Sequence, residues 1–267
     1  LGEKSIISEE KLSRIYPQEN LFSHIIGQID NENTGISGIE KFFDYELKTR
    51  KEPLELTVDI DIQFLVREEL LKFQDIFKSK GSAAILMNVN NGNVISMVSL
   101  PDFNLNKRQE IKDVKFINRA TKGVYELGSV FKTFTIAAGI NEKKIEPATE
   151  FKDLPKSITC AGRSIREYDN KIPSDLTAEE ILIRSGNIGS VRVVQKIGIE
   201  KFKSFLEKIG VLNKIEFDIE EVGQPILFKW GKCKLATSSF GHGITTTPLQ
   251  LAKGYAIITN GGYDIKP

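Results

Sequence analysis

The chain has 267 residues, of which 40% are apolar and 27% charged, and its formal net charge is +1. This length allows one large domain or one domain with a smaller appendage, and the apolar share excludes a chain that is disordered throughout. The small net charge gives no electrostatic attraction to nucleic acid, and the sequence contains no run of eighteen apolar residues that would cross a bilayer.

The first fifty residues are polar and rich in turn-forming residues. Residues 31–35 predict an exposed loop, and apolar residues at helical spacing from Ile39 to Leu47 predict a short amphipathic helix. A basic stretch that ends at Pro53 indicates a boundary near residue 50. The sequence begins with Leu1 and shows no leader segment, so we expect that any targeting sequence has been removed.

Residues 54–100 predict a strand, a helix and a hairpin. Residues 54–60 alternate between apolar and polar, which is typical of a half-buried strand. Residues 61–80 have apolar side chains at helical spacing, with Asp59 or Asp61 as the N-cap. Residues 82–89 and 94–100 are strand-like, and the Asn-Gly pair between them favours a tight hairpin turn.

The rest of the chain is predicted to be mainly helical. Residues 129–140 are apolar almost all round, which indicates a buried helix with Ser129 at its N-cap or in its first turn. Further helices are predicted at residues 177–184, 190–198, 199–210 and 247–259. With the hairpin, these helices predict an α+β fold, a mixed α/β sandwich in which an antiparallel sheet is flanked by helices.

The cysteines and histidines give no sign of a metal centre. Cys160 and Cys233 are too few for a disulfide framework, and their spacing fits no metal motif, so we expect two unpaired or buried thiols. His24 and His242 lie far apart in the sequence and have no ligand-like neighbours, so we expect structural roles for both. We therefore expect neither a metal nor a cofactor.

Ser129 and Lys132 form the clearest chemical pattern. Residues three apart on a helix share a face, so the lysine amine is within reach of the serine hydroxyl. A serine becomes a good nucleophile when a base takes its proton, and a lysine amine can do so when it is neutral. Burial lowers the lysine pKa from its ordinary value of about 10.4. The flanking residues that could provide this burial are Val130, Phe131, Phe134 and Ile136.

Taken alone, this pattern recurs by chance and favours a purely structural interpretation. A phosphate-binding loop is a further alternative, because Gly123 and Gly128 have the required gap. That loop is excluded because Ser129 and Val130 follow the second glycine, where a phosphate-binding lysine would stand.

A second cluster, Ser185-Gly186-Asn187, follows a predicted helix. The hydroxyl of Ser185 can relay a proton, and the carboxamide of Asn187 can bind a peptide carbonyl. Alone, such a cluster is typical of a helix-capping loop. Its order after Ser129 and Lys132 favours a shared site.

Residues 118–132, NRATKGVYELGSVFK, closely resemble the active-serine region of class B penicillin-binding proteins. The resemblance extends over nearly the whole chain. Residues 24–27 and 35–44 resemble the segment between the family's pedestal and its catalytic domain. Residues 87–103 resemble its hairpin and following loop, and residues 236–252 its late glycine-rich stretch and helix. Phe240, between Ser239 and Gly241, is more similar to the division-specific (FtsI) branch than to the elongation branch.

The resemblance implies a penicillin-binding/β-lactamase-like transpeptidase fold, with residues 1–50 from the pedestal and residues 51–267 as the transpeptidase domain. It implies a D,D-transpeptidase that cross-links peptidoglycan stem peptides ending in D-Ala-D-Ala and that β-lactams inhibit. By the same resemblance, Ser129 attacks the carbonyl between the two D-alanines, Lys132 is the base, Ser185 relays the proton and Asn187 binds the substrate amide.

The resemblance also implies partners and a location. The partners are proteins of the division complex and a lipid-linked glycan polymerase, with no nucleic acid. A single N-terminal anchor would precede Leu1 in the inner membrane and hold the catalytic domain on its periplasmic side.

Several positions depart from the family pattern. Leu127 replaces a proline, Gly186 stands where serine or aspartate is commoner, and the junction near Arg50 is shorter than expected. A Lys-Thr-Gly motif does not occur, and the sequence ends at Pro267 before the strand that would carry it. We therefore expect this polypeptide to bind β-lactams poorly or not at all and to be inactive as an enzyme. The alternatives are a class D-type serine β-lactamase and a non-catalytic penicillin-sensing or scaffolding domain.

Overall fold

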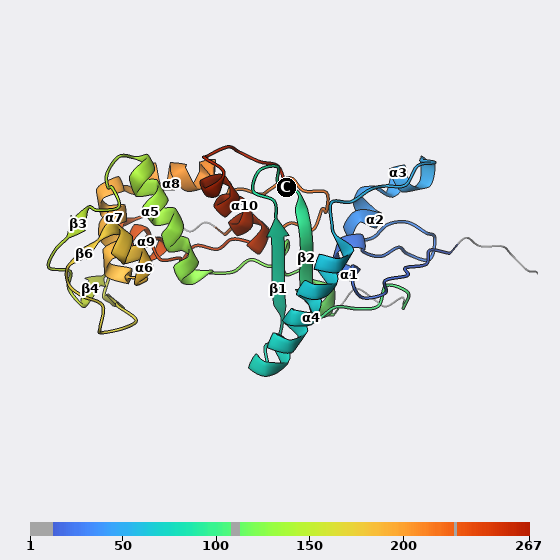
Figure 1. Cartoon of the computed structure of the whole chain (residues 1–267), viewed down its shortest axis with the longest axis horizontal. Coiled ribbons are helices and arrows are strands. Elements are labelled where there is room, and N and C mark those ends of the chain that lie inside the picture. Colours follow the sequence, from blue (N-terminus) through green and yellow to red (C-terminus); the bar gives the residue numbers. More distant parts are fainter. Residues whose placement is uncertain (1–12, 108–112, 227–228) are drawn as a thin grey trace, which may run out of the picture.

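The computed structural model describes residues 13–107, 113–226 and 229–267. In Figure 1 the molecule is elongated. The N-terminal helices occupy one end, a β-hairpin with a long helix lies in the middle, and a cluster of helices with short strands forms the other end. The predicted α+β class is confirmed, because the paired strands are antiparallel and helices flank the central hairpin.

The N-terminal end contains the short helices α1 (Ser23–Ile26), α2 (Gly38–Phe42) and α3 (Asp44–Thr49). The loop predicted at residues 31–35 is present, and the Asp30 carboxylate accepts hydrogen bonds there from the backbone N–H groups of Glu32 and Thr34 at 2.8 and 2.9 Å. The single predicted helix from Ile39 is divided in two, because the backbone of Phe43 leaves the helical conformation.

The central region consists of α4 (Ile60–Phe77), β1 (Ser82–Met87) and β2 (Val94–Leu100). Asp59 is the N-cap of α4, as predicted, and its side chain accepts a hydrogen bond from the Ile62 N–H at 2.9 Å. The strands β1 and β2 form the predicted hairpin. The helix α4 packs mainly on β2, while α10 (Pro248–Thr259) packs on β1.

The strand predicted at residues 54–60 is wrong. These residues run beside β2, where the Asp59 N–H donates to the Ile95 carbonyl at 2.9 Å and the Thr57 hydroxyl donates to the Val94 carbonyl at 2.8 Å. Isolated hydrogen bonds of this kind do not form a ladder. The alternating pattern instead reflects Leu54 and Val58 packing against the nearby core cluster.

The other end of the molecule is built around α5 (Lys132–Asn141), which is preceded by the 3-10 turn η2 (Gly128–Phe131). The surrounding helices are α6 (Ala178–Ile183), α7 (Asn187–Ile197), α8 (Ile199–Lys208) and α9 (Lys232–Ser238). The short strands are β3 (Glu150–Phe151) paired with β6 (Leu176–Thr177), and β4 (Ser157–Cys160) paired with β5 (Arg163–Arg166). A further 3-10 turn, η1 (Val114–Phe116), lies between β2 and η2.

The local helix signals were reliable in this region. The helices predicted at residues 177–184 and 247–259 both begin with a capping box, formed by Thr177 and Glu180 in α6 and by Thr247 and Gln250 in α10. The helix α7 begins at Asn187, three residues earlier than predicted, and α9 was not predicted. The main core lies between α5, α7 and α8, with Phe131, Phe134 and Phe202 fully buried.

Cys160 and Cys233 form a disulfide between β4 and α9, with Cα atoms 5.5 Å apart. The expectation of two unpaired thiols is therefore wrong. The two residues are 73 positions apart in the sequence, and only the packing of the β4–β5 hairpin against α9 brings them together.

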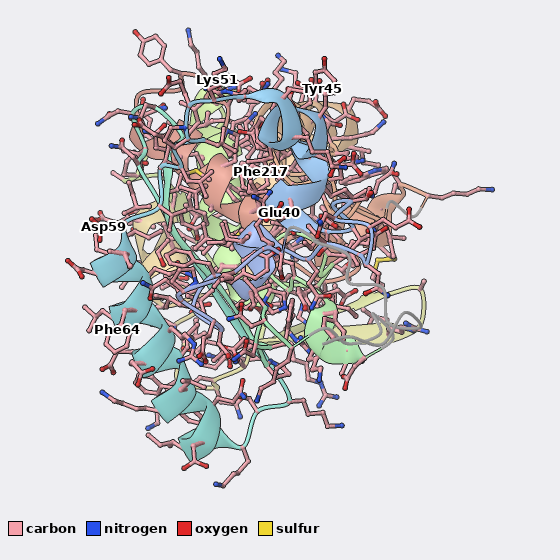
Figure 2. All side chains as sticks on the ribbon, turned by 90° about the vertical axis from the view of Figure 1, so that its right-hand side faces the viewer. Glu40, Tyr45, Lys51, Asp59, Phe64 and Phe217 are labelled. Carbon is pink, nitrogen blue, oxygen red and sulfur yellow. A yellow bond between two sulfur atoms is a disulfide. The ribbon has the colours of Figure 1, made fainter. Side chains whose placement is uncertain are left out.

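The long helix α4 leaves a large apolar surface uncovered. In Figure 2, Asp59 marks its first turn, and Phe64 lies on the side that faces away from the rest of the molecule. Phe64 is 55% exposed and Phe77 is 72% exposed. Throughout the described ranges, every helix is too short or too polar to span a bilayer.

Candidate active site

Ser129 lies in the η2 turn that leads into α5, where the sequence predicted the first turn of a regular helix. Gly128, just before it, has φ +64°, which favours glycine. Gly241 packs directly against Gly128, because a Cβ atom on Gly241 would lie 2.1 Å from the Gly128 carbonyl oxygen. The Tyr255 hydroxyl donates to the Val130 carbonyl at 2.8 Å, which ties this turn to α10. Ser129 itself is exposed.

Lys132 is the first residue of α5, and its side chain is only 1% exposed. Burial lowers the pKa of its amine from 10.5 to about 8, while the negative charge of Glu167 acts in the opposite direction. Phe131 and Phe134 are fully buried neighbours, as expected, but Val130 is 42% exposed and does not enclose the lysine. With this pKa, roughly a tenth of the amine is neutral at pH 7 and about half at pH 8, and the neutral amine is the state that can accept a proton.

The Lys132 amine lies between two serine hydroxyls. Its Nζ atom is 3.2 Å from the Ser129 Oγ atom and 2.8 Å from the Ser185 Oγ atom, and it also donates to the Ser185 carbonyl. Ser129 and Lys132 therefore face the same way, as their spacing predicted. A proton can pass along this chain from one hydroxyl to the amine and on to the other hydroxyl.

Ser185 lies in the turn between α6 and α7, and Asn187 follows at the start of α7. Ser185 adopts φ +53°, a left-handed conformation that is strained for a residue with a side chain. Asn187 is the first residue of α7, and its Nδ2 atom donates to the Arg166 carbonyl at 2.8 Å. A carboxamide nitrogen carries two hydrogens, so a second N–H remains for a ligand carbonyl.

Glu167, which follows β5, was not predicted from the sequence. Its carboxylate accepts hydrogen bonds from the backbone N–H groups of Asn187 and Ile188 at 2.6 and 2.8 Å. No local pattern identifies Glu167, because its partners lie some twenty residues further along the chain.

Among the residues that the structure describes, no group of histidine, cysteine, aspartate and glutamate has an arrangement suited to a metal ion. His24 is buried, and its Nε2 atom lies 2.7 Å from the Lys115 carbonyl, which is a structural contact.

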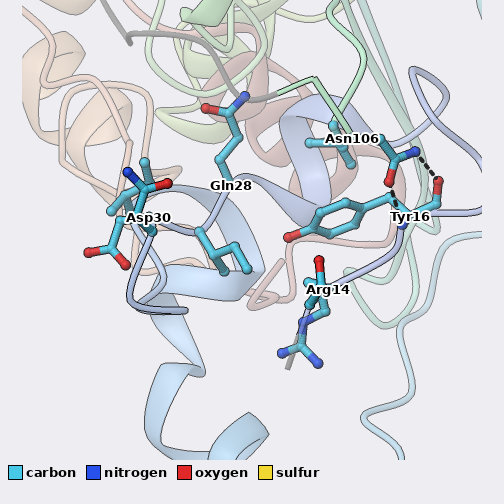
Figure 3. Close-up of a pocket in the computed structure, with 10 residues that line it drawn as sticks. Arg14, Tyr16, Gln28, Asp30 and Asn106 are labelled. Carbon is cyan, nitrogen blue, oxygen red and sulfur yellow. Dashed lines mark hydrogen bonds between the residues drawn. The ribbon is translucent and has the colours of Figure 1, made fainter. Parts of the chain in front are cut away.

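A pocket at the N-terminal end is separate from this cluster (Figure 3). It has a volume of about 330 Å³, and Arg14, Tyr16, Gln28, Asp30 and Asn106 are among its lining residues. The Asn106 side chain bonds both the N–H and the carbonyl of Tyr16, and Arg14 pairs with Glu40 at 2.9 Å. These contacts hold the chain segments together and offer no nucleophile beside a base.

Residues 82–267 match the family described as "Penicillin binding protein transpeptidase domain". The chain is 30% identical over 267 residues to "Probable peptidoglycan D,D-transpeptidase FtsI" of Caulobacter vibrioides, covering 98% of this chain and 45% of that protein. It is 27% identical over 286 residues to "Peptidoglycan D,D-transpeptidase FtsI" of Escherichia coli, covering 96% of this chain and 47% of that protein. The chain thus spans about half the length of the curated relatives it matches.

Among solved structures, penicillin-binding protein 3 of Mycobacterium tuberculosis superposes with a TM-score of 0.83 and 24% identity, covering 94% of this chain and 59% of that one. The same protein has been solved in complex with aztreonam, with a TM-score of 0.82, 24% identity and the same coverage. These similarities show that the fold is that of a penicillin-binding transpeptidase.

Proposed function

This chain belongs to the penicillin-binding protein transpeptidase family and resembles its class B, FtsI-type members, and from this premise we propose that it acts as a serine D,D-transpeptidase. In this proposal it cross-links peptidoglycan stem peptides that end in D-Ala-D-Ala. The observation that supports it most directly is the buried Lys132 amine between the hydroxyls of Ser129 and Ser185.

The first half-reaction is acylation. The neutral Lys132 amine accepts the proton of the Ser129 hydroxyl as the oxygen bonds to the carbonyl carbon between the two D-alanines. The C–N bond breaks, and the D-alanine amine leaves with a proton that passes from Lys132 through the Ser185 hydroxyl. The free N–H of Asn187 binds an amide carbonyl of the stem peptide and orients it.

The second half-reaction restores the enzyme. The amine of a neighbouring stem peptide attacks the ester carbon on Ser129, the bond between that carbon and the serine oxygen breaks, and a new amide bond forms. The proton that the attacking amine loses passes through Ser185 and Lys132 to the serine oxygen. A β-lactam presents a strained amide to the same nucleophile, and the ester that forms on Ser129 is long-lived. No metal or cofactor takes part in these steps.

The proposal extends to the organisation of the whole protein. Residues 1–50 belong to the pedestal, and residues 51–267 belong to the transpeptidase domain. An anchor in the inner membrane holds the domain on the periplasmic side, where proteins of the division complex and a lipid-linked glycan polymerase are its partners.

The direct test is labelling of the full-length protein with a fluorescent penicillin. We expect the unaltered protein and Ser204→Ala, a control on α8, to be labelled, and Ser129→Ala to remain unlabelled. Labelling of Ser129→Ala, or no labelling of the unaltered protein, would contradict the proposal. Rapid hydrolysis of nitrocefin would instead indicate a β-lactamase.

A second test concerns the base. Lys132→Arg should abolish acylation while circular dichroism shows a retained fold, because a guanidinium group stays charged near neutral pH. Acylation of Lys132→Arg at a near-normal rate would show that Lys132 is not the base.

A further inference from the structure

The turn that carries Ser185 is stabilised by hydrogen bonds to a segment of the chain some twenty residues earlier. Ser185 has a strained left-handed backbone, and Gly186 follows it with a conformation typical of an N-cap. On the α6 side, the Gly186 N–H donates to the Ile181 carbonyl at 2.9 Å. On the α7 side, the first two N–H groups of the helix would lack partners without another segment of the chain.

Glu167 supplies those partners. One oxygen of its carboxylate accepts from the Asn187 N–H at 2.6 Å, and the other accepts from the Ile188 N–H at 2.8 Å. The negative charge lies at the positive end of an eleven-residue helix, which strengthens both hydrogen bonds. The neighbouring Arg166 carbonyl accepts from the Asn187 side chain, so residues 166 and 167 hold Asn187 by its backbone and its carboxamide.

We propose that Glu167 is a positioning residue of the acylation site, whose carboxylate fixes the turn at residues 185–187 and so keeps the Ser185 hydroxyl in contact with the Lys132 amine. This inference rests on the proposed function. The proposed role is distinct from catalysis, because Glu167 acts through Ser185 and Asn187 and bonds neither Ser129 nor the Lys132 amine.

The charge of Glu167 has a second effect that an experiment can separate from its geometry. It is the charged group that raises the pKa of Lys132, against the larger effect of burial. Four of the charged side chains on the helices packed against α5 have partners of their own. Glu180 forms the α6 capping box, Arg192 bonds Gln195, Lys196 lies over the Phe151 ring, and Lys201 pairs with Glu142. Removing the negative charge of Glu167 should therefore ease the loss of the Lys132 proton.

The test compares Glu167→Gln and Glu167→Asp in the full-length protein, with acylation by a fluorescent penicillin measured from about pH 6 to 10. The unaltered rate should rise as Lys132 loses its proton, around pH 8. Glu167→Gln keeps one acceptor oxygen and loses the charge. We expect its maximal rate to fall about tenfold to a hundredfold, the scale of a misplaced catalytic group, and its acid limb to move to lower pH. Glu167→Asp keeps the negative charge, so its acylation rate should rise at the same pH as that of the unaltered protein. Its shorter side chain reaches the α7 N–H groups less well and should lower the maximal rate.

The matched control is Glu180→Gln. Glu180 also caps a helix N-terminus with its carboxylate, but it lies on α6 and bonds Thr177. We expect its rate and its pH profile to match those of the unaltered protein. The inference is overturned if Glu167→Gln is acylated at the unaltered rate. It is also overturned if the rate falls but its rise with pH stays at the same pH, since a general loss of packing would lower the rate in that way. Failure of the proposed function is distinguishable, because the unaltered protein would then not be acylated at all.

Discussion

At the scale of single residues, Lys132 combines near-complete burial with three oxygen contacts. The two hydroxyls and the carbonyl around its amine accept hydrogen bonds from it but carry no charge to balance an ammonium group. Burial therefore lowers its pKa to about 8, although Glu167 opposes the change. A lysine adjusted in this way is suited to accept a proton near neutral pH.

The lowered pKa has a measurable consequence for stability. Between about pH 8 and 10.5 the unfolded chain keeps a proton on Lys132 that the folded chain has lost. The contribution of this residue to the free energy of unfolding therefore rises with pH across that window, is complete above it and is lost as pH falls through it.

We predict that the unaltered protein gains stability relative to Lys132→Met as the pH rises from about 8 to 10.5. Urea unfolding of both proteins across this range measures the difference in their free energies of unfolding. The other titratable groups are the same in both proteins, so their effects cancel in this difference. A stability difference that does not change with pH would show that the lysine has an ordinary pKa in the folded protein.

At the scale of secondary structure, local signals predicted most elements and their ends. The hairpin turn, the Asp59 cap and the capping box at Thr177 each act within a few residues, so a short stretch of sequence contains all the partners. The strand predicted at residues 54–60 failed because a strand needs a partner ladder, and β2 offers these residues only isolated hydrogen bonds. Pairing of strands depends on the whole fold.

The disulfide is the clearest example of an element-level contact that local patterns do not contain. It joins the β4–β5 hairpin, which leads directly to Glu167, to α9, which leads to Gly241. We predict that Cys160→Ser/Cys233→Ser lowers the free energy of unfolding by about 2–4 kcal/mol, because the closed loop restricts the unfolded chain.

Urea unfolding measures the loss, and faster hydrogen exchange in β4 and β5 should accompany it. A reducing agent should destabilise the unaltered protein and leave the double variant unchanged. Equal stability of the oxidised protein and the double variant would contradict this role.

At the scale of the whole molecule, the elongated arrangement of Figure 1 separates the proposed active site around α5 from the N-terminal helices. The central hairpin and α4 lie between them. The helix α4 exposes four large apolar side chains, Phe64, Phe73, Ile76 and Phe77. Figure 2 shows Phe64 on the side that faces away from the rest of the molecule. Apolar surfaces of this kind promote association in water.

We predict that Phe64→Lys/Phe77→Lys raises the solubility of this polypeptide and changes its free energy of unfolding by no more than about 0.5 kcal/mol per site, because both side chains are already exposed. Light scattering and urea unfolding measure the two effects. The control is Phe202→Ala, a fully buried residue of α8, which should cost about 3–5 kcal/mol. A comparable loss in the α4 variant would show that its face is packed in solution.

The amino-acid sequence alone determined the features that depend on near neighbours. These are the shared face of Ser129 and Lys132, the helix caps and the hairpin, and the resemblance that identified the transpeptidase fold. Each depends on residues a few positions apart or on a contiguous motif. Only the tertiary structure decided that Cys160 meets Cys233, that Glu167 holds the turn at residues 185–187, and how far burial shifts the pKa of Lys132. These features depend on which distant segments pack together, and that packing is a property of the whole chain.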